Sequence, residues 1–136
     1  MSFLLLITSF TYAQDSTSVY FKTGSHKIST FSQKVLDDLF TNLDYTDLIE
    51  IKFIGYSDST GNFESNQRLS ERRAKAVSKA VKGYLTPRIS CATESKGELP
   101  RKVDSLSRRV DIIFTYSVLS EANEKDTILI QPEDPR

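Results

Sequence analysis

Two adjacent arginines near the middle of the chain carry side chains whose chemistry depends on the direction in which each one points. Arg72 and Arg73 lie within GYSDSTGNFESNQRLSERRAKAV, residues 55–77, which reads as a turn followed by an amphipathic helix. At ~100° per residue, Arg72 falls on the charged face of that helix, whereas Arg73 shares the apolar stripe with Asn66. An inward guanidinium keeps its proton and needs an anion or several acceptors. We therefore predict that Arg73 points into the protein, toward such a partner.

Asp58 is the candidate anion nearest to this helix in the sequence. It lies just past the end of an expected strand, and the next turn would bring it back over the helix N-terminus, whose free N–H groups are positively polarised. Asp58 could then hold an ammonium group while Arg73 and the helix end hold a carboxylate, as in a recognition site for an amino acid. Asn66 and the hydroxyl groups of Ser57 and Thr60 would line the same pocket. The alternative is an internal Asp58–Arg73 salt bridge that binds no ligand.

The surrounding sequence predicts the elements that must position these residues. In chain order they are a strand at 18–22, a helix at 31–43, a strand at 48–56, a helix at 65–85, and strands at 88–95 and 108–117. The order β-α-β-α-β-β predicts an α+β fold, a two-layer sandwich in which two helices pack on one face of a small mixed sheet. A loop of about ten residues would allow the last two strands to be antiparallel neighbours.

Length and composition narrow the class of protein. The chain has 136 residues, which suits one domain, and its formal net charge of zero argues against non-specific binding to nucleic acid. The sequence contains no Cys/His pair within range, no His-Glu-x-x-His motif, no phosphate-binding loop and no obvious acid pair. We therefore expect no enzymatic activity, no cofactor and no metal site. Cys91 is the one cysteine, so the fold does not depend on an internal disulfide.

The two ends of the chain differ in composition from the middle. An apolar run from Phe3 to about Phe10 precedes Ala13 and is too short to span a bilayer. We predict a signal peptide over residues 1–13 and no transmembrane segment in the mature chain; the alternative is a buried first strand or helix. Residues 118–136 are mostly polar and acidic, which predicts a loosely held tail. Within that tail TILIQ, residues 127–131, could add a short strand or bind a neighbour.

Three motifs occur in the order found in one known family. They are Gly55-Tyr56-Ser57-Asp58, the helical pattern Asn-x-x-Leu-Ser-x-x-Arg-Ala-x-x-Val at residues 66–77, and Arg108-Arg109-Val110. Together they resemble the Gly-His-Thr-Asp turn, the central helix and the late strand of the OmpA-like peptidoglycan-binding domains. These domains occur in OmpA-type porins, Pal lipoproteins and MotB stator proteins. The resemblance extends over about residues 18–116, and we place the domain at residues 18–117.

The resemblance implies both a function and a set of contacts. In the family, the Asp and the Arg hold diaminopimelate, the zwitterionic arm of the peptidoglycan stem peptide, and this role falls on Asp58 and Arg73. Further ligand contacts would come from Thr60, Asn66 and Arg108. The chain would then bind peptidoglycan without catalysis. It would do so in the periplasm, as an exported protein associated with the cell wall or the outer membrane, and could contact other envelope proteins.

Lys22 and the loop Thr93–Pro100 depart from the family pattern. The first strand of the family usually ends in an acidic residue where this chain has Lys22, and the usual Gly-x-Gly-Glu-x-x-Pro loop is shifted and shortened here. Both changes affect the surroundings of the expected pocket. They motivate an alternative function, in which a degenerate OmpA-like domain acts as a structural or protein-interaction module in the periplasm.

Overall fold

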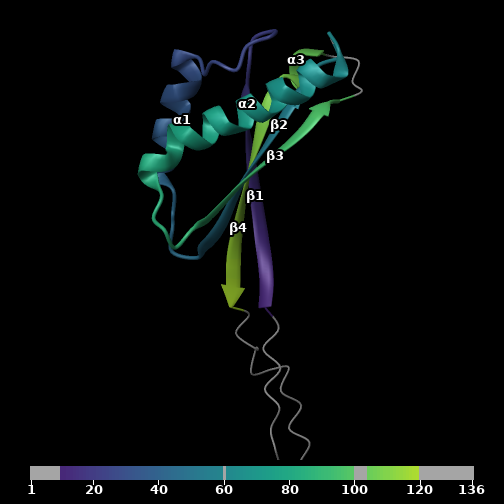
Figure 1. Ribbon diagram of the computed structural model, residues 1–136. Helices are drawn as coiled ribbons and strands as arrows, with labels where there is room; N and C mark the ends of the chain where they lie inside the picture. The colour runs from purple at the N-terminus through teal and green to yellow at the C-terminus, as the bar shows by residue number, and fades with distance from the viewer. Residues whose placement is uncertain (1–9, 60, 100–103, 120–136) are drawn as a thin grey trace, which may run out of the picture.

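The computed structural model describes residues 10–59, 61–99 and 104–119 (Figure 1). Within these residues helices and strands follow one another in the predicted order, and a short helix that the sequence did not predict precedes the last strand. The elements are β1 (Phe10–Tyr20), α1 (Thr30–Asn42), β2 (Leu48–Ser57), α2 (Phe63–Val81), the 3-10 helix η1 (Lys82–Tyr84), β3 (Ser90–Glu98), α3 (Asp104–Ser107) and β4 (Arg109–Leu119).

The strands of the described chain form one mixed sheet in the order β1-β4-β2-β3. β4 is antiparallel to both of its neighbours, with Tyr20 of β1 opposite Arg109 and Gly55 of β2 opposite Val110. β2 and β3 are parallel, as a crossover through α2 allows. The carboxyl end of β2 therefore lies beside the amino end of β4, at the end of the sheet where β1 finishes.

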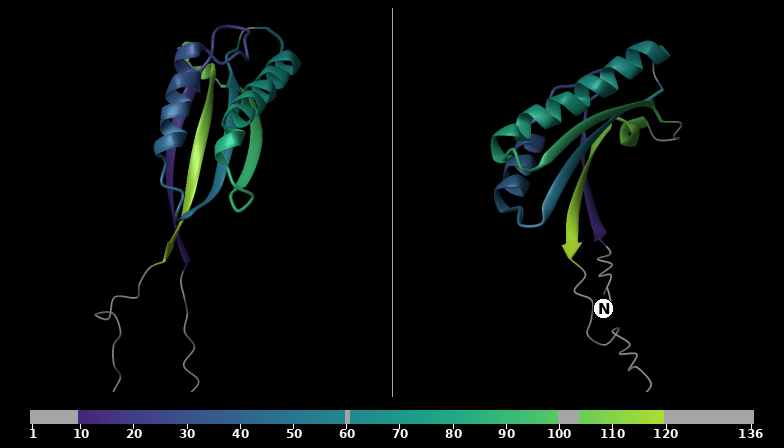
Figure 2. Two further views of the ribbon diagram at one scale, coloured as in Figure 1. Left: turned by 90° about the vertical axis from the view of Figure 1, so that its left-hand side faces the viewer. Right: turned by 60° about the horizontal axis from the view of Figure 1, so that its bottom comes forward.

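Both α1 and α2 lie on the same face of the sheet, so the predicted two-layer α+β sandwich is confirmed (Figure 2). The space between the layers is filled by aliphatic and aromatic side chains, as expected for a two-layer domain. The ring of Phe40 from α1 packs 5.8 Å from that of Phe114 in β4, measured between centroids. The buried core consists of Val19, Phe21, Leu36, Phe40, Leu48, Ile51, Phe53, Ala74, Val77, Val81, Ile89, Val110, Ile112 and Phe114.

The orientation of the two helices follows from their sequence pattern and caps. α1 begins where Ser29 accepts a hydrogen bond from the Ser32 N–H, and α2 begins where Asn62 accepts one from the Ser65 N–H. α2 starts two residues before the predicted position and gives way to η1 after Val81. The buried residues of α2 are Asn66, Ser70, Arg73, Ala74, Val77 and Val81, whereas Arg72 is exposed, so the predicted directions of the arginine doublet are confirmed.

The position of the last strand differs from the sequence expectation. β4 does not lie beside β3 but between β1 and β2. The inward residues of β4 are apolar and at most 3% exposed, whereas β3 has the polar sequence SCATESKGE and buries only Gly97. A central strand must be apolar on its core-facing side, whereas a polar strand is tolerated at the edge of a sheet.

The first residues of β2 also differ from the predicted alternation. Regular alternation along LIEIKFIGY, residues 48–56, would bury Ile49 on the same face as Ile51, but Ile49 is 36% exposed, while Leu48 is 1% exposed. The pairing of β2 with β4 shifts register between Leu48 and Glu50. A shift of one residue exchanges the two faces of a strand, which accounts for the difference.

The ends of the described chain form a two-stranded ribbon that extends beyond the helical layer (Figure 1). β1 begins at Phe10, so residues 10–13 of the predicted signal peptide lie in a strand paired with β4. Residues 1–9 lie outside the described residues, and the signal peptide stays a prediction. β4 continues to Leu119, two residues into the predicted tail, whose remaining part, including TILIQ, also lies outside the described residues.

Candidate functional site

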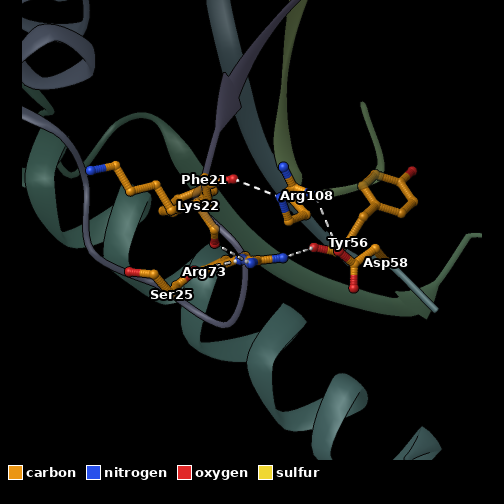
Figure 3. Close-up of polar contacts among 7 residues, drawn as sticks. All are labelled: Phe21, Lys22, Ser25, Tyr56, Asp58, Arg73 and Arg108. Atoms are coloured by element: carbon orange, nitrogen blue, oxygen red, sulfur yellow. Dashed lines mark hydrogen bonds and ion pairs between the residues drawn. The ribbon is translucent and has the colours of Figure 1, made fainter. Parts of the chain in front are cut away.

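Arg73 projects from α2 toward the carboxyl end of β2 and is completely buried, with 0% of its surface exposed. Each guanidinium nitrogen donates to a backbone carbonyl: Nε to Ser25 (2.8 Å), Nη1 to Tyr56 (3.0 Å) and Nη2 to Lys22 (3.1 Å). Figure 3 shows the side chain between the loop after β1 and the end of β2. Arg73 therefore joins two separate segments through acceptors that carry no formal charge.

Burial affects the electrostatics of Arg73. Loss of water lowers the pKa of the guanidinium to about 10, the nearby Asp58 carboxylate opposes this change, and Arg108 adds to it. Arg73 stays a cation at neutral pH. Its Cζ atom lies 5.3 Å from the ring centroid of Phe21, which adds a cation–π contact. The interior of the site therefore has a fixed positive charge that favours a nearby anion.

Asp58 and Arg108 form an ion pair next to Arg73. Arg108 Nη1 lies 3.2 Å from Asp58 Oδ2, and Arg108 Nε donates to the carbonyl of Phe21 at 3.1 Å. The side chain of Asp58 is 7% exposed and that of Arg108 is 20% exposed. Arg108 is therefore the more accessible of the two arginines at this site.

Close contact between α2 and β2 sets the depth at which Arg73 enters the site. A Cβ atom added to Gly55 would lie 1.9 Å from the carbonyl oxygen of Ser70, so only glycine fits beneath the helix here. The Ser70 hydroxyl accepts a hydrogen bond from the Gly97 N–H at 3.1 Å and donates one to the Gln67 carbonyl at 2.8 Å. These contacts hold α2 against β2 and β3, the two strands that lead into the site.

The arrangement of Asp58 and Arg73 differs from the direct salt bridge that the sequence left open. Among the described contacts, Arg73 bonds to backbone carbonyls while Asp58 bonds to Arg108. The Asp58 carboxylate is close enough to oppose the lowering of the Arg73 pKa by burial, but each of the two charged groups has its own hydrogen-bond partners. The predicted residues Asp58, Arg73 and Arg108 therefore gather at one place, with Arg108 in the contact that was expected of Arg73.

Asn66 stands apart from this group. The Asn66 side chain is buried, and its Nδ2 donates to Glu98 Oε1 at 2.7 Å, which joins the first part of α2 to the end of β3. Thr60 lies outside the described residues. The ligand contacts predicted for both residues stay predictions.

Two buried serine hydroxyls precede the members of the ion pair. Ser57 and Ser107 are 0% exposed, and within the described part of the chain neither Oγ atom has a hydrogen-bond partner. Buried polar groups without partners are uncommon in folded proteins. Ser57 was expected to line the pocket, whereas Ser107 belongs to the short helix α3 that the sequence did not predict.

The loop after β1 supplies partners that the sequence analysis missed. Lys22 and Ser25 contribute backbone carbonyls, which leave no side-chain pattern in a sequence. Gly24 between them has a φ of 67°, and the Ser25 N–H donates to the Lys22 carbonyl at 3.1 Å. Gly24 favours this tight turn because glycine tolerates a positive φ, but it does not indicate that an arginine binds the carbonyls on either side.

Comparison with known proteins decides the family. The sequence profile of the OmpA family matches residues 20–109 of the 136. The chain belongs to the OmpA family. This confirms the resemblance indicated by the three motifs, and the matched segment contains Asp58, Arg73 and Arg108.

Curated relatives match parts of this chain. Outer membrane protein 41 of Porphyromonas gingivalis (strain ATCC BAA-308 / W83) is 47% identical over 49 residues, which are 35% of this chain and 12% of that protein. Outer membrane protein A of Serratia odorifera is 30% identical over 91 residues, which are 65% of this chain and 37% of that protein. The chain thus spans well under half the length of these two relatives.

A solved structure agrees with the OmpA-family assignment. The crystal structure of the peptidoglycan-associated lipoprotein from Burkholderia pseudomallei superimposes with a TM-score of 0.60 and 26% identity, covering 71% of this chain and 88% of that one. Within the described ranges of the present chain, no helix is both long and apolar enough to cross a membrane. In the same residues, no group of three or more His, Cys, Asp or Glu side chains could hold a metal ion. The expected lack of enzymatic activity and of a cofactor stays a prediction.

Proposed function

We propose that the chain binds peptidoglycan without catalysis, through the diaminopimelate residue of the stem peptide. Membership of the OmpA family and the likeness to a peptidoglycan-associated lipoprotein support this proposal. The observation that carries it is the Asp58–Arg108 ion pair, with 3.2 Å between its charged atoms, beside the buried cation of Arg73.

This ion pair suits a zwitterionic ligand. An amino-acid group carries an ammonium and a carboxylate on one carbon atom, the charges complementary to Asp58 and Arg108. In our proposal the ammonium group binds Asp58 and the carboxylate binds Arg108. Arg73 contributes a positive potential from the interior and fixes the loop carbonyls, while Thr60 and Asn66 provide further contacts.

The same proposal places the chain in the periplasm, bound to the cell wall close to the outer membrane. Two relatives are named outer membrane proteins, which supports an envelope location. A diaminopimelate-binding domain has its ligand only where it can reach the wall, so the location follows from the proposed ligand. Other envelope proteins are proposed as further partners.

Sedimentation with purified sacculi tests this function. Asp58→Asn and Arg108→Gln each remove one charge with little change in side-chain size, and we expect each to lower the affinity for sacculi about tenfold. Arg109→Gln is the matched control, because Arg109 adjoins Arg108 in sequence but bonds to Asp111, with 2.8 Å between Nε and Oδ1. Undiminished sedimentation of both site variants, with circular dichroism spectra like the wild type, would refute the proposed site.

The internal contacts of the site favour a second candidate, a degenerate domain that acts as a structural or protein-interaction module. Arg73 already binds three carbonyls, Asp58 already binds Arg108, and Lys22 replaces the usual acidic residue. Titration with meso-diaminopimelate, followed by NMR, separates the two candidates. Shifts centred on Asp58 and Arg108 at millimolar ligand support binding, and their absence supports the degenerate module.

A further inference from the structure

A cavity of about 550 Å³ opens next to Arg108, between the end of β1, the loop into α1 and the start of α1. The residues around it include Tyr20, Phe21, Lys22, Lys27, Thr30 and Arg108. Asp58 and Arg73 do not line it. The cavity therefore adjoins the proposed diaminopimelate site, with which it shares Arg108 and the loop after β1 that carries Lys22 and Ser25.

Positive charge dominates this cavity. Lys22, Lys27 and Arg108 are the charged residues of its described lining, and no carboxylate is among them. The first turn of α1, at the same place, contains no acidic residue, so the positive end of that helix is not neutralised locally. Cations gathered around a concave surface that is partly apolar attract an anion more strongly than the same charges spread over a flat surface.

The contacts of Arg108 and Lys22 leave their positive charges facing the cavity. Arg108 is fixed at two nitrogens, by the Phe21 carbonyl (3.1 Å) and by Asp58 (3.2 Å), and its side chain stays 20% exposed. The Lys22 carbonyl is held by Arg73 Nη2, whereas the Lys22 side chain is exposed and extends away from Asp58 (Figure 3). Lys22 therefore adds charge to the cavity without competing for Asp58.

We propose that this cavity is a second anion subsite, which binds a carboxylate of the stem peptide outside the diaminopimelate group. The inference rests on the proposed function, because it takes the ligand at Asp58 and Arg108 as given. A stem peptide carries the α-carboxylate of its glutamate, either free or amidated, and a terminal carboxylate. A free carboxylate forms charge-assisted hydrogen bonds with Lys22 and Lys27, whereas an amide offers no charge. The subsite makes the chain prefer acidic stem peptides to amidated ones.

Calorimetric titration of the whole chain with three probes tests the subsite. The probes are meso-diaminopimelate, the tripeptide L-alanyl-γ-D-glutamyl-meso-diaminopimelate, and the same tripeptide with its glutamate amidated. We expect the wild type to bind the amidated tripeptide about fivefold more weakly than the acidic one. Lys22→Gln should bind both tripeptides equally and diaminopimelate as the wild type does. Lys34→Gln, on an exposed lysine of α1 that does not line the cavity, should keep the wild-type preference.

A tetrapeptide that adds a terminal D-alanine identifies the source of the carboxylate. If affinity falls only when this terminus is amidated, and the fall depends on Lys22, the subsite binds the terminal carboxylate. If affinity falls only when the glutamate is amidated, the subsite binds the glutamate carboxylate.

Two outcomes would refute the subsite. Either neither amidation weakens binding, or the Lys22→Gln variant keeps the wild-type ratios of affinity. Titration with diaminopimelate separates failure of the subsite from failure of the proposed function. If diaminopimelate binds but the acidic and amidated peptides bind equally, only the subsite is wrong. If neither diaminopimelate nor sacculi bind, the proposed function is wrong.

Discussion

Two arginine doublets, one in a helix and one at the start of a strand, each send one side chain into the site and the other elsewhere. In α2, Arg72 is exposed while Arg73 is fully buried, because adjacent helical residues are about 100° apart. At the start of β4, Arg108 precedes the strand and bonds to Asp58, while Arg109, the first strand residue, bonds to Asp111. The same dipeptide is thus divided by the helical period in α2 and by the start of the strand in β4.

Arg73 and Arg108 have different roles because their side chains are buried to different extents. Arg73 is 0% exposed and bonds only to carbonyls of the backbone, so its donors stabilise the shape of the site. Arg108 is 20% exposed and bonds to a carboxylate, so its charge can be offered to a ligand that replaces or shares this partner. Burial, rather than residue type, separates the structural arginine from the proposed binding arginine.

The largest expected effect is on stability, from Arg73→Met. Methionine fills a similar volume but removes all three donors, so the carbonyls of Lys22, Ser25 and Tyr56 lose these hydrogen bonds. We expect the free energy of unfolding to fall by about 3 kcal/mol, measured by urea denaturation. A loss below about 1 kcal/mol would mean that other donors replace the guanidinium and that Arg73 is not structural in this sense.

Gly55→Ala disturbs the packing of the same helix, α2, against β2. We expect it to have the next largest effect on stability. The added Cβ would meet the Ser70 carbonyl at 1.9 Å, so α2 must shift outward and withdraw Arg73 from its carbonyls. We expect a loss of about 2 kcal/mol in the free energy of unfolding. Gly83→Ala is the matched control, since a Cβ there meets nothing within 4 Å. Equal stability of both alanine variants would contradict the close approach of α2 to β2.

Arg109→Gln tests the outward member of the strand doublet. Arg109 bonds to Asp111, which raises the pKa of the guanidinium, and its Cζ atom lies 4.7 Å from the ring centroid of Tyr56. We expect thermal denaturation to show a loss of no more than about 1 kcal/mol and sedimentation with sacculi to be unchanged. A loss of sacculus binding as large as that of Arg108→Gln would show that the two strand arginines are not divided as described.

Arg72→Gln should have the smallest effect. Arg72 is exposed on the charged face of α2, so we expect a change within about 0.5 kcal/mol in urea denaturation and no change in sacculus binding. The difference in stability between Arg72→Gln and Arg73→Met measures how strongly the position of a residue around the helix determines its contribution to folding. A measurable binding defect in Arg72→Gln would place the ligand on the outer face of the helix.

The inward direction of Arg73 could be predicted because it depends on one local quantity, the helical period. The family and the sandwich fold could be predicted because the three motifs and the order of elements are also local in sequence. The partners of Arg73 could not, because they are carbonyls 48 and 51 residues away in Ser25 and Lys22. A helical wheel shows that a buried arginine needs acceptors, but only the folded chain shows which acceptors reach it.

The contacts of Arg108 and the position of β4 in the sheet could not be predicted either, because they also depend on segments that are distant in the sequence. Asp58 lies 50 residues before Arg108, and the two meet because β4 inserts between β1 and β2. The sequence predicted a strand at residues 108–117 but not its neighbours in the sheet, since the order of strands depends on contacts between segments that are distant in the sequence. Ile49 departs from the alternation of its strand because the pairing with β4 shifts register between Leu48 and Glu50.

The position of the strand ends determines how this domain carries mechanical load. The chain enters β1 at Phe10 and leaves β4 at Leu119, which pair at one end of the sheet, while Asp58 and Arg108 lie at the other. The eleven residues of β1 place roughly 35 Å between these ends. Tension between a ligand at Asp58 and either end of the ribbon runs along the strands, so their hydrogen bonds are sheared together instead of being peeled apart one at a time. A load applied between Asp58 and the paired ends of β1 and β4 would therefore act on the sheet in shear.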